Sequence, residues 1–174
     1  EFRRVLFRSP YAPLASAFGE LCHQLLMEPS ESLARFRDQI QLALGTSGQG
    51  LLQMIPALAM IVGPQPDAPE LEGAAARRRI IRLFQRLLAV FATLGRPLVL
   101  FLDDLQWIDQ ASMDVLASLL EEGESRHLLI IGAYRSNEVD AAHPLSLAVR
   151  DLGAKASVHT VELGPLERSD VSRF

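Results

Sequence analysis

Cysteine and lysine are almost missing from this sequence, with one of each, Cys22 and Lys155, among 174 residues. A single cysteine excludes an internal disulfide framework and a metal site built from thiolates, and it favours a reducing, cytoplasmic setting. Long apolar runs are also missing. The longest, Leu51–Gly63, is too short to span a bilayer and is interrupted by Gln53 and Pro56. The sequence therefore predicts neither a disulfide scaffold nor a membrane-spanning protein.

The chain also lacks an excess of positive charge and any obvious catalytic or zinc motif. Its formal net charge is -4, which argues against a general polyanion binder. Arg78, Arg82 and Arg86 recur at helical spacing. We interpret them as a solvated helix face, with contact to DNA as the alternative. The four histidines have no ligand spacing, and no serine lies in a nucleophile-elbow motif, so neither a zinc site nor a hydrolase triad is predicted.

What the chain does contain is enough apolar sequence for a core, at 49% apolar and 22% charged residues. Helical apolar spacing predicts helices over residues 14–27, 30–44, 51–61, 74–94, 110–122 and 143–152, and from 166 onward. Asp109 is expected to cap the helix that starts at residue 110, and Gly95 to end the longest one. Strands are predicted at residues 98–102, 128–134 and 158–163. Strands separated by helices indicate an α/β fold, a parallel sheet with helices on both faces.

Two carboxylates follow the first buried strand, at Asp103 and Asp104. Ligands of parallel sheets bind beyond the carboxyl ends of the strands, where these acids lie. Neighbouring residues on a strand point to opposite faces, so the two acids cannot do the same work. One can hold a magnesium ion and the other can orient or deprotonate a water. The alternative is an acidic turn in which Asp104 is a local cap.

Arg135 stands just past the second strand, at the edge where the acids are expected. Arginine binds phosphate through two parallel hydrogen bonds and offsets the charge that develops in phosphoryl transfer. The alternative is a surface arginine paired with Glu138 or Asp140.

The segments Leu98–Asp109 and His127–Arg135 resemble the AAA/STAND-type P-loop ATPase domain, of the origin-recognition-like group, in bacterial signalling proteins. Further segments resemble the version in multi-sensor serine/threonine and histidine kinases: Pro10–Leu14, Gly63–Pro66 and Phe84–Leu88. The resemblance implies an ATP- and Mg²⁺-dependent regulatory domain attached to kinase or sensor domains. It implies that Asp103 is the Walker B magnesium residue, Asp104 the acid that activates water, and Arg135 a sensor arginine.

The sequence departs from that family because no Gly-x-x-x-x-Gly-Lys-Ser/Thr phosphate loop (Walker A) occurs in it. The glycine-rich stretch Gly45–Gly50 lacks a lysine and follows a helix rather than a buried strand. We therefore expect a P-loop NTPase-like sheet whose first two strands are missing, with marginal stability, exposed apolar surface and no useful ATP binding by this chain alone.

The sequence is expected to have three parts. Residues 1–9 resemble a translated sequencing adapter and are interpreted as a non-native leader, 10–72 as a helical region, and 73–174 as the Walker B and sensor core. Two other functions stay open. One is a nucleic-acid-associated AAA ATPase, which the acidic balance disfavours, and the other is a non-catalytic helical interaction module.

Overall fold

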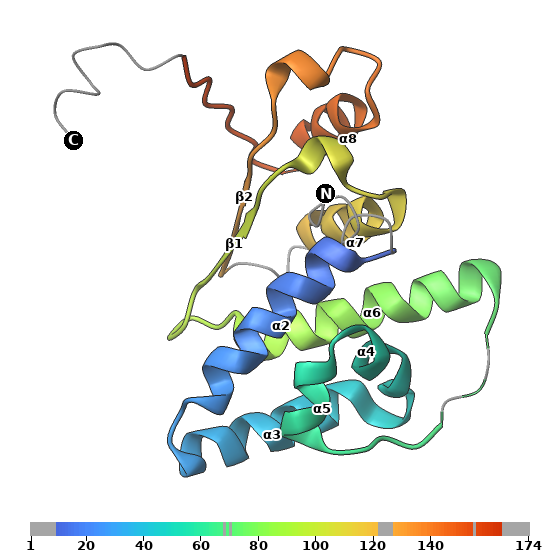
Figure 1. Cartoon of the computed structure of the whole chain (residues 1–174), viewed down its shortest axis with the longest axis vertical. Helices are drawn as coiled ribbons and strands as arrows, with labels where there is room; N and C mark the ends of the chain where they lie inside the picture. The colour runs from blue at the N-terminus through green and yellow to red at the C-terminus, as the bar shows by residue number, and fades with distance from the viewer. Residues whose placement is uncertain (1–9, 68, 70, 122–126, 155, 165–174) are drawn as a thin grey trace, which may run out of the picture.

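A two-stranded parallel sheet packs against a group of helices in the computed structural model (Figure 1). The structure describes residues 10–67, 69, 71–121, 127–154 and 156–164. Strands β1 (Leu98–Leu102) and β2 (Leu128–Gly132) pair in register, from Leu98 opposite Leu128 to Leu102 opposite Gly132. Helix α7 (Gln110–Glu121) lies between them in the sequence, as a parallel crossover requires. The predicted α/β fold with a parallel sheet is confirmed.

The remaining helices form a group that packs beside the sheet. They are α2 (Ala12–Leu26), α3 (Ser30–Leu44), α4 (Gln49–Met54), α5 (Pro56–Val62), α6 (Gly73–Phe91) and α8 (Pro144–Gly153). One continuous hydrophobic core runs from Leu14 on α2 to Leu119 on α7 and includes Leu100 and Leu102 of β1. At its centre, the rings of Phe18 and Phe84 lie 5.3 Å apart between centroids. The core therefore joins the predicted helical region to the strands.

Helix α6 carries the apolar stripe that its sequence predicts, but it ends earlier than expected. Leu83, Phe84, Leu87, Leu88 and Phe91 are buried, and Ile80 is half-buried. The helix stops at Phe91, and the N–H of Ala92 donates to the carbonyl of Leu88. Gly95 is not the cap. It lies in a turn closed by two backbone hydrogen bonds between Thr93 and Arg96, of 3.0 and 2.9 Å.

The glycine-rich stretch at residues 45–50 is not an open loop. A 3-10 turn, η1 (Gly45–Ser47), leads directly into α4. The helix predicted over residues 51–61 is split at Ile55, and α5 begins at Pro56. Proline suits the first turn of a helix because its missing N–H would have no partner there. The glycine-rich stretch therefore joins α3 to α4, whereas a phosphate loop joins a strand to a helix.

The two faces of the sheet differ in exposure. Leu100 and Leu102 face the core, whereas the alternate positions Val99, Phe101, Leu129 and Ile131 are 43–60% exposed. In Figure 1 the labelled helices lie to one side of the strands. Among the described residues, no helix covers the second face of the sheet, which differs from the prediction of helices on both faces. The apolar surface that this leaves exposed agrees with the expectation of exposed apolar surface.

The third predicted strand, over residues 158–163, does not form. The structure assigns no strand there, and Val161 and Leu163 are 79% and 88% exposed. A strand is stable only when a neighbour satisfies its backbone groups, and β1 and β2 pair only with each other in the described part. The leader at residues 1–9, the helix end near Gly123 and the helix expected from residue 166 lie outside the described residues. No helix in the described part has the length and apolar content that crossing a bilayer requires.

Candidate functional site

The acid pair and the arginine meet at the carboxyl end of the sheet. The strand pairing continues past β1 and β2 through two backbone hydrogen bonds. The N–H of Ala133 donates to the carbonyl of Leu102 over 2.8 Å, and the N–H of Leu105 donates to the carbonyl of Ala133 over 2.9 Å. These bonds hold the segment after β1 against the segment after β2. Side chains from two segments some thirty positions apart in the chain therefore share one edge.

Asp103 and Asp104 have different environments. Asp103 is exposed, whereas Asp104 is only 7% exposed. Asp104 has left-handed backbone angles, with φ 55° and ψ 40°, and its N–H donates to Oδ1 of Asp103 over 2.8 Å. Aspartate is one of the few residues other than glycine that visit this conformation, and such residues cluster at functional sites. This turn leaves the carboxylate of Asp103 exposed to solvent, whereas the carboxylate of Asp104 is buried at the edge of the sheet.

Gln106 is the residue that holds this arrangement together, and the sequence analysis missed it. Its side chain is 6% exposed and lies on the 3-10 turn η2 (Leu105–Trp107). Nε2 of Gln106 donates to Oδ1 of Asp104 over 3.1 Å, and its Oε1 accepts from the N–H of Arg135 over 3.3 Å. One amide thus joins the acid after β1 to the backbone after β2. A glutamine between Leu105 and Trp107 was the only sequence signal, because its burial depends on tertiary contacts.

Arg135 is shared between two carboxylates. Its Nε lies 3.8 Å from Oδ1 of Asp104, and its Nη1 lies 3.3 Å from Oε1 of Glu138. The guanidinium carbon is 5.8 Å from the centroid of the Trp107 ring. The expected surface pairing with Glu138 and the expected approach to the acid pair therefore both occur. Because the Arg135 side chain is 58% exposed, these pairs add little to stability and leave the guanidinium accessible.

Asp109 caps α7, as its position in the sequence predicts. Its Oδ1 accepts from the N–H of Ser112 over 2.9 Å, and its Oδ2 accepts from the Ser112 hydroxyl. Oδ1 also lies 3.4 Å from the N–H of Tyr11, which precedes α2. Asp109, five residues after Asp104, therefore connects the start of α7 to the start of α2.

The donor set at this edge suits a magnesium ion that arrives with a phosphate. The described residues contain no group of three His, Cys, Asp or Glu side chains that would form a cage from protein ligands alone. Mg²⁺ characteristically binds one or two carboxylates and completes its shell with water and phosphate oxygens. Asp103, exposed at the edge, can supply such a single carboxylate. Asp104 is less suited, since Gln106 and Arg135 already surround it.

Comparison with known proteins places the chain in a family. The model of the AAA ATPase domain family matches residues 3–131, so the chain belongs to that family. The matched range includes Asp103, Asp104 and Gln106 and ends before Arg135. The chain is also 32% identical over 114 residues to hybrid signal transduction histidine kinase G of Dictyostelium discoideum. That alignment covers 66% of this chain and 3% of the relative. No solved structure matches the chain significantly.

Proposed function

We propose that this chain carries the magnesium-binding and water-activating acids of an ATP-dependent regulatory domain in a signal-transduction protein. Membership of the AAA ATPase domain family and the similarity to a histidine kinase support a regulatory AAA-type domain. The observation that carries the proposal is the contrast between an exposed Asp103 and a buried Asp104 beside Arg135, at the carboxyl end of a parallel sheet.

Each of the three side chains has a distinct role in this proposal. The exposed carboxylate of Asp103 would hold Mg²⁺, which would neutralise charge on the nucleotide phosphates. The carboxylate of Asp104, oriented by Gln106, accepts a hydrogen bond or a proton from the attacking water. The guanidinium of Arg135 offsets negative charge that develops on the transferred phosphoryl group. ATP and Mg²⁺ supply the phosphoryl group and its charge neutralisation, so the protein mainly positions the reactants.

The phosphate loop is the part of such a site that this sequence does not contain. That loop supplies backbone amides, a lysine and a magnesium-binding hydroxyl. We therefore expect the 174-residue chain to show no micromolar binding of a fluorescent ATP analogue, with or without Mg²⁺. Micromolar, magnesium-dependent binding by this chain would contradict that expectation.

The catalytic roles are tested in a chain from the same gene that includes a Gly-x-x-x-x-Gly-Lys-Ser/Thr segment. Asp104→Asn should abolish ATP hydrolysis while leaving nucleotide binding in place. Asp103→Asn should remove the magnesium dependence of binding. Asp38→Asn, an exposed acid on α3, is the matched control and should change neither. Hydrolysis at the unaltered rate by Asp104→Asn would remove Asp104 from its role. Absence of any phosphate loop encoded upstream would remove the ATPase function.

The wider setting of this domain rests on the resemblance noted from the sequence. We propose attached kinase or sensor domains, a STAND-type switch and a cytoplasmic, bacterial setting, with direct binding of nucleic acid not expected. Arg78, Arg82 and Arg86 are exposed on α6, as both the solvated-face interpretation and the DNA-contact alternative require.

A non-catalytic interaction module is the second candidate function, and one observation favours it. The apolar sheet face formed by Val99, Phe101, Leu129 and Ile131 is exposed, and exposed apolar patches mark interaction sites. Signalling that persists in the parent protein after the Asp103 and Asp104 substitutions would support this candidate over the ATPase.

A further inference from the structure

A cavity that is open to solvent lies at the opposite end of β1 from the acid pair, between α3 and the turn that follows α6. Its volume is about 340 Å³, within the usual range for small-molecule sites. It is lined by Ser32, Arg35, Phe36, Gln39, Val90, Thr93, Gly95 and Arg96. Arg96 stands two residues before β1, and Asp103 follows the last residue of that strand. About 17 Å of strand separates the two places, so the cavity is not part of the proposed ATPase site.

Two arginine side chains line this cavity, and no acidic side chain lines it with them. Arg35 comes from α3 and Arg96 from the turn after α6, and no carboxylate is among the lining residues. Within the described part of the chain, neither arginine makes an ion pair. An anion bound between two guanidinium groups interacts favourably with both.

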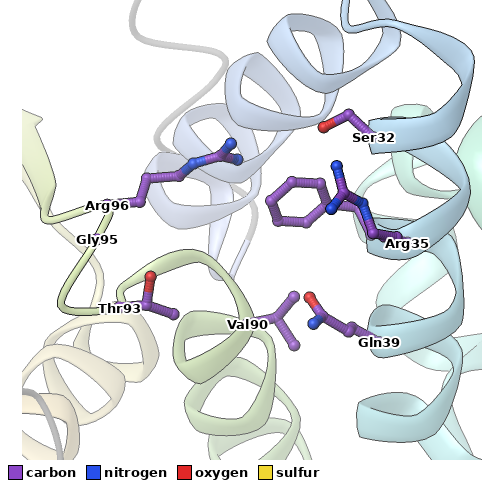
Figure 2. A pocket seen from close by; sticks show the side chains of 8 residues that line it. Ser32, Arg35, Gln39, Val90, Thr93, Gly95 and Arg96 are labelled. Carbon is purple, nitrogen blue, oxygen red and sulfur yellow. The ribbon is translucent and has the colours of Figure 1, made fainter.

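The surrounding side chains add hydrogen-bonding groups and two apolar side chains, Phe36 and Val90. Figure 2 shows Ser32 and Arg35 on one wall and Arg96 and Thr93 on the other. The guanidinium carbon of Arg96 lies 4.5 Å from the centroid of the Phe36 ring, so its position is partly fixed by that contact. Two backbone hydrogen bonds between Thr93 and Arg96 hold these two residues side by side. The backbone bonds and the ring contact together restrict the position of Arg96.

We propose that this cavity binds a phosphate monoester. The two guanidinium groups match the charge of a phosphate monoester, about -1.5 to -2 at neutral pH. Their forked donors, with the hydroxyls of Ser32 and Thr93 and the amide of Gln39, exceed what the two oxygens of a carboxylate can use. They suit the three acceptor oxygens of a phosphate. Phe36 and Val90 would contact the organic part of the ligand.

The test uses the whole 174-residue chain and phenyl phosphate as the probe, in a calorimetric titration at neutral pH and low salt. We expect saturable binding to a single class of site. Gln39→Glu places a carboxylate in the cavity with almost no change of shape and should weaken binding at least roughly tenfold, as should Arg96→Gln. Gln39 and Arg96 are exposed, so neither substitution disturbs the core.

Matched controls separate this site from general charge effects. Gln24→Glu on α2 and Arg86→Gln on α6 make the same changes at exposed positions outside the cavity and should leave the affinity unchanged. Absence of saturable binding, equal weakening by the control variants, or equally tight binding of benzoate would overturn the proposal. A free phosphate ester and a phosphorylated side chain share this chemistry. Tighter binding of phenyl phosphate than of N-acetyl phosphoserine amide supports the free ester as the source, and the reverse order supports a phosphorylated segment.

Discussion

The side-chain amide of Gln106 donates to Oδ1 of Asp104 over 3.1 Å while both residues are more than nine-tenths buried. Replacing Gln106 with leucine keeps a similar volume but removes this donor and the acceptor for the N–H of Arg135. Losing buried hydrogen-bond partners costs about 1–3 kcal/mol. We expect Gln106→Leu to lower the free energy of unfolding by that amount in urea denaturation.

The control for this substitution is Gln110→Leu. Gln110 is exposed and donates to Asp114 at the surface over 2.9 Å. Exposed substitutions of this kind change stability by no more than about 0.5 kcal/mol. Equal effects of the two substitutions would show that the Gln106 amide does not support the site.

The cap at Asp109 gives a second prediction. Removing its carboxylate leaves the N–H of Ser112 without its partner at the start of α7. We expect Asp109→Ala to lower the free energy of unfolding by about 1–2 kcal/mol, measured by urea denaturation. Asp109→Asn keeps a side-chain oxygen and should cost less. An asparagine variant that is as unstable as the alanine variant would indicate that the negative charge, and not the cap, matters.

Gly132 ends β2 where Leu105 crosses it closely. A Cβ atom at residue 132 would lie 2.3 Å from Cδ1 of Leu105, so the leucine side chain would have to move. We expect Gly132→Ala to destabilise the protein by about 1 kcal/mol, because the end of a leucine side chain can move aside at moderate cost. The double variant with Leu105→Ala should be more stable than the sum of the two single effects predicts. Additive effects would show that the two side chains do not collide.

Gly19 provides the opposite case, since a Cβ atom there meets nothing within 4 Å. It lies inside α2, where glycine costs conformational entropy. Gly19→Ala should therefore raise the free energy of unfolding by about 0.5–1 kcal/mol. A lower thermal midpoint for this variant would contradict the described packing of α2.

Cys22 is fully buried on α2, and burial raises the pKa of its thiol from 9.0 to about 12. Because the thiolate is the reactive form, the folded chain should not react with Ellman's reagent at neutral pH until urea unfolds it. The raised pKa also makes stability fall as the pH rises from 9.0 towards 12, since the unfolded chain releases the proton more readily.

This pH dependence is isolated by Cys22→Ala. The pKa of Tyr11 is also raised, chiefly by burial, so other groups contribute to the loss of stability at high pH. The difference in urea midpoint between the unaltered chain and Cys22→Ala should shrink as the pH rises through that window. A constant difference would show that the Cys22 thiol does not stay protonated in the folded state.

Local sequence pattern alone determined most of the elements and the place of the candidate site. The stripe of α6, the parallel strands and the cap at Asp109 follow from apolar spacing and from a side chain that bonds to its own neighbouring backbone. The acids and Arg135 could be placed at one sheet edge because parallel strands end on the same side. These features depend on residues close together in the chain or on a general rule of sheet topology.

The tertiary structure decided what depends on distant partners. The burial of Gln106, the sharing of Arg135 between Asp104 and Glu138, and the cavity between Arg35 and Arg96 each join segments that no local pattern relates. The absence of a strand over residues 158–163 follows the same logic, because an apolar segment becomes a strand only where another strand satisfies its backbone. Sequence pattern fixes which face of an element is apolar, whereas the neighbours in space decide what that face contacts.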